Sequence, residues 1–150
     1  HANTSKRQVK RPKVYVADSG LLHTLHRIAA RDALLAHPIC GASWEGFVIE
    51  EVIAALGADR RDCFFWATHA GAELDLFVLH QGRRLGFEIK RTSAPRRTKS
   101  MAVASADLQL DRLDVVYDGD AVFPMAERLR AVGVAQLDEA LAADRPRINR

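Results

Sequence analysis

Asp75, Glu88 and Lys90 have the side-chain types and the spacing of a hydrolytic site. Asp75 lies in the run ELDLFVLH, and Glu88 and Lys90 lie in the run RLGFEIKRT, with Gln81-Gly82 between the two runs. A two-residue loop of this kind predicts a β-hairpin in which Asp75 directly faces Glu88. A slip by one residue would scramble both faces of the hairpin, so the apolar pattern selects this register. Because side chains alternate along a strand, Lys90 is expected on the same face as Glu88.

Two opposed carboxylates beside an ammonium suit a hard divalent cation and an attacking water. Directly opposed residues have Cβ atoms about 5 Å apart, so two like charges there need a positive group between them. The backbone carbonyl of Ile89 could add a further ligand to Asp75 and Glu88. In the competing interpretation, Lys90 only neutralises the two carboxylates in a surface ion network.

Glu45 is a third carboxylate that is expected to point at the same place, from a helix. An apolar stripe at helical spacing follows it: Val48, Ile49, Val52, Ile53 and Leu56. Ser43 is the expected N-cap of this helix and Gly57 its C-terminal stop. Glu45 continues the stripe backward by three and four residues, so it should face the sheet, where a carboxylate is costly unless it is paired or metal-bound. In the alternative, Glu45 lies in a solvated first turn and favours the helix dipole.

The elements that must position these residues follow from apolar periodicity and turn residues. Strands are predicted at residues 13–17, 63–68, 73–80, 84–92, 113–117 and 121–124. Helices are predicted at residues 21–28, 31–36, 43–56, 99–110 and 136–143. The central order is helix, three strands, helix, strand, which predicts an α/β fold with helices flanking a mixed sheet.

With Glu45 on the first core helix, Asp75 on the second strand and Glu88-Ile89-Lys90 on the third, the chain resembles the PD-(D/E)XK nuclease superfamily over about residues 43–117. It looks closest to the C-terminal nuclease-like domain that follows the ATPase core in a family of prokaryotic AAA-type ATPases. The runs KVYVADSGLL, GASWEGFVIEEV, ELDLFVL and GFEIKRT are typical of that family. The resemblance implies a restriction-endonuclease-like αβββαβ core, although Leu74 stands where the superfamily usually has Pro.

The resemblance also implies roles for the site residues. Asp75 and Glu88 would hold Mg²⁺ or Mn²⁺, Lys90 would orient or polarise the hydrolytic water, and Glu45 would complete the metal shell. Restriction, resolvase and repair enzymes share the superfamily, so the substrate does not follow from the resemblance.

Basic residues flank the predicted hairpin and are the expected nucleic-acid contacts: Arg83, Arg84, Arg91, Arg96, Arg97 and Lys99. They would grip phosphates without reading sequence. Alternatively, they form a solvated surface. The formal charge of +3 and the pI near 9.1 permit contact with nucleic acid without demanding it.

Length and composition predict one domain, because 150 residues with 48% hydrophobic content suit a single core. Residues 1–12 are expected to be a linker or an appended remnant, and residues 13–150 a single nuclease-like domain that is a piece of a longer protein. No apolar run approaches the roughly 20 residues of a membrane span, and no signal-peptide pattern is present, so we expect a cytoplasmic protein without membrane contact. Without a GxxxxGKS/T loop, these residues are not expected to hydrolyse ATP.

Two functions agree with these observations. The first is a Mg²⁺-dependent phosphodiesterase acting on DNA, as one domain of a larger ATPase. The second is a catalytically silent nuclease-like module that binds nucleic acid or a protein partner and regulates the attached AAA-type ATPase. The expected partners are DNA, an upstream ATPase domain of the same chain and, in a homo-oligomer, further copies of the chain.

Overall fold

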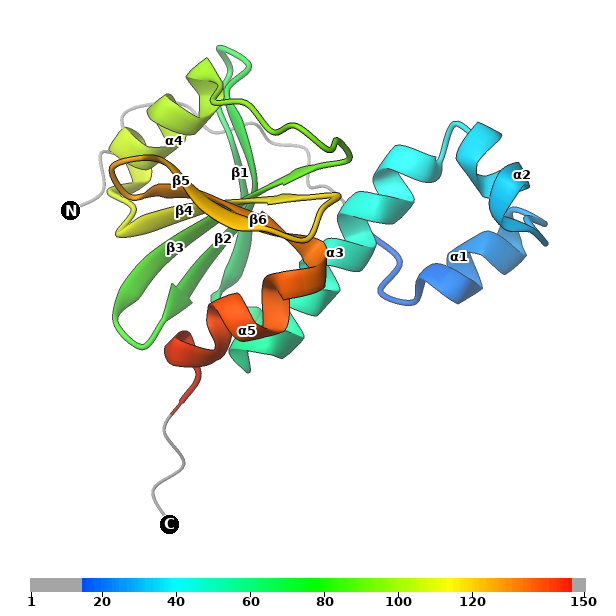
Figure 1. Ribbon diagram of the computed structural model, residues 1–150, viewed down its shortest axis with the longest axis horizontal. Coiled ribbons are helices and arrows are strands. Elements are labelled where there is room, and N and C mark those ends of the chain that lie inside the picture. The colour runs from blue at the N-terminus through cyan, green and yellow to red at the C-terminus, as the bar shows by residue number, and fades with distance from the viewer. Residues whose placement is uncertain (1–14, 147–150) are drawn as a thin grey trace.

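The computed structural model describes residues 15–146, which form a six-stranded sheet with helices on both faces (Figure 1). The strands are β1 (Cys63–Ala67), β2 (Glu73–His80), β3 (Arg83–Lys90), β4 (Arg112–Tyr117), β5 (Val122–Ala126) and β6 (Leu129–Gly133). The helices are α1 (Ser19–Leu25), α2 (Arg31–Ala36), α3 (Cys40–Leu56), α4 (Lys99–Leu108) and α5 (Leu137–Leu141). Short 3-10 turns are η1 (Arg60–Asp62), η2 (Val134–Gln136) and η3 (Ala142–Asp144).

The sheet mixes antiparallel and parallel pairs in the order β1-β2-β3-β4-β6-β5. β1, β2 and β3 form an antiparallel meander, and α4 then carries the chain to β4, which runs parallel to β3. β6 pairs in parallel with β4, and β5 forms the far edge, antiparallel to β6. The prediction of an α/β fold with a mixed sheet between helices is therefore confirmed.

Two apolar clusters fix the layers. On one face of the sheet, Val52 of α3 and Leu141 of α5 belong to the same cluster as Phe87 of β3. On the other face, Met101 of α4 belongs to a cluster with Leu113 of β4. Full burial of each such side chain contributes about 1.5–3 kcal/mol. Burial against the sheet thus holds α3 and α5 on one face and α4 on the other.

α1 and α2 lie outside these layers, beside the N-terminal end of α3 (Figure 1). Neither helix contains a buried residue, and Leu21, Leu25 and Leu35 are exposed. Their position therefore depends on contacts with α3 rather than on the core. None of the helices within residues 15–146 has the length and apolar character needed to cross a bilayer.

Several predicted boundaries are corrected by the structure. α3 begins at Cys40, so Ser43 lies inside the helix and is not its N-cap. Instead, the hydroxyl of Ser43 lies 2.7 Å from Nε2 of His23, a hydrogen bond that links α3 to α1. Gly57 does end the helix in the left-handed conformation, as predicted. Residues 15–17 are not in a strand, and the rest of the first predicted strand lies outside the described residues.

β6 has no counterpart among the predicted elements. Its buried residues Leu129, Ala131, Val132 and Gly133 do not alternate with exposed ones, because the strand is covered on both faces. Short parallel strands of this kind lack the period-2 signal on which strand prediction depends. The helix predicted at residues 136–143 is shorter than expected, since η2 and η3 flank α5.

Candidate functional site

Five residues predicted to act in metal binding or hydrolysis border one pocket of about 340 Å³. The pocket lies at the open end of the β2–β3 hairpin, away from the loop that joins the two strands. Its lining comes from α3, the loop between β1 and β2, β2, β3 and the start of α4: Glu45, Gly71, Glu73, Asp75, Glu88, Ile89, Lys90, Thr98 and Ser100. Side chains far apart in the sequence are thus brought to one place.

A β-bulge in β2 directs Asp75 towards the end of β3. Between two regions of regular pairing, β1 contributes one residue where β2 contributes two, Asp75 and Leu76. The ladder between β2 and β3 ends at Leu76, and Oδ2 of Asp75 then accepts a hydrogen bond from the backbone N–H of Ile89 at 2.8 Å. Bulges are frequent beside active sites because the extra residue re-aims a side chain.

The bulge makes one part of the predicted register wrong. The hairpin is paired as predicted from its loop to Leu76, but the predicted pairs of Leu74 with Ile89 and of Asp75 with Glu88 are not part of the described ladder. Leu74 packs in the cluster under α4, whereas Ile89 packs in the cluster under α3. The two carboxylates therefore reach the same pocket through the bulge and not through direct cross-strand pairing.

Glu88 is a buried acid with an incomplete set of partners. Its side chain is 8% exposed, and Oε1 forms an ion pair with Nζ of Lys90 at 2.6 Å. Oε2 is buried and has no hydrogen-bond partner within the described part of the chain. An unsatisfied buried polar atom costs about 1–3 kcal/mol, and more when the group is charged. Such an atom beside a pocket favours a further partner from outside the described residues.

Lys90 is held in its charged form by the acids around it. Burial opposes the charge, but the hydrogen bond and the charge of Glu88, together with the charges of Asp75 and Glu45, raise the pKa of Lys90. Lys90 therefore remains an ammonium at neutral pH. Because its side chain is 39% exposed, the ammonium can be reached by a ligand in the pocket.

Glu45 is half-buried and lies in the second turn of α3, since the helix begins at Cys40. The hydroxyl of Tyr15 donates a hydrogen bond to Oε1 of Glu45. Glu45 also contributes to the raised pKa of Lys90. The alternative of a solvated carboxylate in the first turn is therefore wrong, and the predicted orientation towards the sheet is correct.

Within residues 15–146, no group of three or more His, Cys, Asp or Glu side chains has the geometry of a metal site. Two carboxylate oxygens at the pocket already have protein partners. Oε1 of Glu88 pairs with Lys90, and Oδ2 of Asp75 accepts a hydrogen bond from the N–H of Ile89. The donors nevertheless fit a hard cation in chemical type, because carboxylate oxygens come from three elements and one of them is a buried atom without a partner.

Four further residues at the site were not predicted from the sequence. Glu73 borders the pocket two residues before Asp75, so strand alternation could have indicated it. Thr98 and Ser100 flank the start of α4, where Thr98 caps the helix. No local signal marks Tyr15, whose contact with Glu45 depends on the path of the chain before α1.

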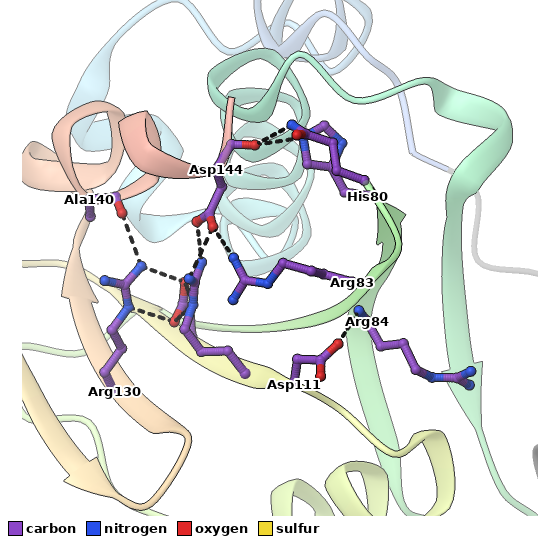
Figure 2. Close-up of polar contacts among 10 residues, drawn as sticks. His80, Arg83, Arg84, Asp111, Arg130, Ala140 and Asp144 are labelled. Atoms are coloured by element: carbon purple, nitrogen blue, oxygen red, sulfur yellow. Dashed lines mark hydrogen bonds and ion pairs between the residues drawn. The ribbon is translucent and has the colours of Figure 1, made fainter. Parts of the chain in front are cut away.

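The predicted basic contacts separate into two groups. Arg83 and Arg84 lie at the loop end of the hairpin, and Arg83 is five residues, or about 17 Å along the strand, from Glu88. Arg83 pairs with Asp144, and the backbone N–H of Arg84 donates to Asp111 (Figure 2). The second group borders or follows the open end of the hairpin: Arg91, Arg96, Arg97 and Lys99, all of them exposed.

A network of buried carboxylates and arginines lies at the loop end of the sheet (Figure 2). Asp144 of η3 pairs with Arg83, and also with Arg112 at 2.6 Å. Asp114 of β4 pairs with Arg112 and Arg130 at 3.0 and 2.8 Å. Burial favours the neutral form of Asp144, but Arg112 and Arg83 outweigh it and lower the pKa of this carboxyl. Arg83 is thus part of the packing that joins η3 to the sheet.

Comparisons with known proteins place the chain in a family. Residues 40–137 match the model described as Domain of unknown function (DUF4143). The uncharacterized proteins Rv2008c of Mycobacterium tuberculosis and Mb2031c of Mycobacterium bovis are each 48% identical to the chain over 147 residues, a match that covers 94% of this chain and 33% of each relative. The chain therefore spans about a third of the length of the curated relatives it matches. No solved structure gives a significant match. Because the family model covers well over half of its length, this chain belongs to the DUF4143 family.

Proposed function

We propose that the pocket around Glu88 binds a divalent cation, Mg²⁺ or Mn²⁺, and that the domain hydrolyses phosphodiester bonds in DNA. The observation that carries the proposal is the buried Oε2 of Glu88, which has no partner within the described residues although Glu45, Asp75 and Lys90 border the same pocket. The resemblance to the PD-(D/E)XK superfamily, with its restriction-endonuclease-like core, supports it, as does the element order α3-β1-β2-β3-α4-β4.

Each residue has a role that agrees with its surroundings. A divalent cation held by Glu45, Asp75 and Glu88, with the backbone carbonyl of Ile89 as a further ligand, would neutralise phosphate charge and ease deprotonation of a water. Lys90 stays protonated, so it donates hydrogen bonds to the phosphate or to the water and is not the general base. The bond from the N–H of Ile89 holds the carboxylate of Asp75 in a fixed direction.

The exposed basic residues near the open end of the hairpin would hold the phosphate backbone: Arg91, Arg96, Arg97 and Lys99. Arg83 and Arg84 are left out of this surface, because they lie at the other end of the hairpin and are bonded to the protein.

The test is cleavage of linear, branched and single-stranded DNA with Mg²⁺ or Mn²⁺. Asp75→Ala and Lys90→Ala should both lose cleavage, whereas Glu127→Gln, which changes an exposed carboxylate far from the pocket in sequence, should retain it. Cleavage by the wild-type chain that persists in both pocket variants would overturn the assignment of the site.

A second candidate function is a silent module that binds nucleic acid or a protein partner and regulates an attached AAA-type ATPase. The ion pair between Lys90 and Glu88 favours this alternative, since it satisfies part of the carboxylate without a cation. The chain covers only a third of each relative, which is compatible with a further domain that the module would regulate. Equal DNA binding by the wild-type chain and both pocket variants, with no cleavage under either cation, would support the module over the enzyme.

A further inference from the structure

A second pocket, of about 320 Å³, lies between the α1–α2 pair and the N-terminal half of α3. It shares no lining residue with the acidic pocket. Its wall combines two guanidinium groups with an imidazole and two aromatic rings: Arg31, Arg91, His23, Trp44 and Phe47.

The charge at this pocket is positive, and none of the ion pairs within residues 15–146 involves its two guanidinium groups. Arg31 and Arg91 have no carboxylate partner within residues 15–146, in contrast to Arg83 at the loop end of the hairpin. Asp118 is the one acid among the described residues of the lining, so two guanidinium groups meet a single described carboxylate. Guanidinium groups with unused donors favour a phosphate or another oxyanion, which they bind with two parallel hydrogen bonds.

The rest of the wall suits a flat apolar body. The rings of Trp44 and Phe47 lie with centroids 6.2 Å apart, and Leu34 and Leu35 of α2 also line the pocket. Nε1 of Trp44 is buried without an acceptor within the described residues. Aromatic side chains provide stacking surfaces for nucleobases, worth about 1–3 kcal/mol for each base. A phosphate and a planar base are two of the three parts of a nucleotide, and the third is the sugar that joins them.

The two pockets are neighbours on two elements. Trp44 precedes Glu45 on α3, and Arg91 follows Lys90 at the end of β3, so each pair of Cα atoms is separated by one peptide unit of about 3.8 Å. The two pockets thus draw on adjacent residues of the same two elements, although adjacent side chains on a helix or strand point in different directions.

We propose that this second pocket binds a nucleotide, with the phosphate at Arg31 and Arg91 and the base against Trp44 and Phe47. Its place next to the scissile phosphate rests on the proposed phosphodiesterase function, whereas nucleotide binding as such does not. A base can enter the pocket only after it leaves its stack, so the substrate is a single strand or a frayed end rather than an intact duplex.

Tryptophan fluorescence tests the proposal directly. The chain has two tryptophans, so Trp66→Phe leaves Trp44 as the reporter. In EDTA, which prevents cleavage, deoxythymidine monophosphate should quench Trp44 saturably, and a short single-stranded oligonucleotide should bind at least about tenfold more tightly than a blunt duplex of the same length. The free nucleotide and the oligonucleotide distinguish a mononucleotide site from a subsite for a strand.

The Arg31→Gln, Arg91→Gln double variant should weaken nucleotide binding at least about tenfold, equivalent to 1.4 kcal/mol. Arg128→Gln, at another exposed arginine, is the matched control and should bind normally. An unchanged emission spectrum without ligand shows that the double variant leaves the surroundings of Trp44 intact. Quenching that does not saturate, or that is the same in the double variant, overturns the proposal.

The two proposals fail in different ways. Nucleotide quenching without DNA cleavage under any condition leaves the second pocket in place and removes the phosphodiesterase. Normal cleavage of single strands by the double variant leaves the phosphodiesterase in place and removes the role of the second pocket in holding the substrate, since the acidic pocket then works without it. Glu88→Gln should abolish cleavage and leave quenching by the mononucleotide unchanged.

Discussion

The two ends of the β2–β3 hairpin both bury charge, but they differ in how completely the charge is paired. At the loop end, two carboxylates, Asp114 and Asp144, share three arginines. At the open end, four carboxylates border a pocket that contains one ammonium, that of Lys90, and Oε2 of Glu88 has no partner within the described residues. Buried charge alone therefore does not distinguish a functional site from a structural one. The difference between the two ends is the one buried carboxylate oxygen, Oε2 of Glu88, on which the proposed function depends.

The charge network at the loop end should contribute more to the free energy of unfolding than the open end does. Asp144→Asn would leave Arg112, whose side chain is 17% exposed, and Arg83 without their shared carboxylate. Breaking a buried pair by removing one partner costs about 3–5 kcal/mol. Chemical denaturation measures this loss, and Glu127→Gln serves as a control that should change little. A loss below about 1 kcal/mol would place the network among ordinary surface pairs.

A divalent cation should stabilise the chain through the pocket at the open end of the hairpin and not through the charge network at the loop end. If Mn²⁺ binds the folded chain, a concentration of 100 times its Kd stabilises the wild-type chain by about 2.7 kcal/mol. Glu88→Gln removes the buried carboxylate that is the proposed cation ligand, so this stabilisation should disappear. Asp144→Asn should retain it in full. Thermal melts with and without Mn²⁺ provide the measurement, and an equal shift in wild type and Glu88→Gln contradicts the assigned ligand.

Removing the single ammonium sharpens the comparison further. Lys90→Met removes the partner of Oε1, so neither oxygen of the buried Glu88 carboxylate then has a partner within the described residues, at a cost of about 1–3 kcal/mol. A bound cation would restore the missing positive charge, so Mn²⁺ should stabilise this variant more than the wild-type chain. The opposite order, with a smaller shift in Lys90→Met, would show that Lys90 assists cation binding.

The smallest effects should come from pH, and they should have opposite signs at the two ends. The pKa of Asp144 is lowered in the folded chain, so its contribution to stability is present above its ordinary value of 3.8 and is lost as the pH falls through the folded pKa. The pKa of Lys90 is raised, so its contribution is present below 10.5 and is lost as the pH rises through the folded pKa. Unfolding free energies across pH should therefore slope less in acid for Asp144→Asn and less in alkali for Lys90→Met. Parallel curves for all three proteins would contradict the pairing.

Local pattern was sufficient for the features that depend on one element or one hairpin. Alternation along β2 and β3 gave the register from the loop to Leu76, and the stripe of α3 correctly directed Glu45 to the sheet. Local pattern did not predict the bulge at Asp75, because the bulge arises from pairing between β2 and β1, which are separate segments. The unpartnered Oε2 of Glu88 is likewise a property of packing and leaves no trace in residue order.

The position of Asp144 has a practical consequence for how this domain is divided. The family match ends at residue 137, so a protein trimmed to residues 40–137 would keep Glu45, Asp75, Glu88 and Lys90. The same truncation would delete the anion that neutralises two arginines, together with the fully buried Leu141. Expression of the shorter piece should yield an unstable product even though each acidic ligand is present. The packed structure extends at least to Asp144, the last residue of η3, beyond the span that the family model matches.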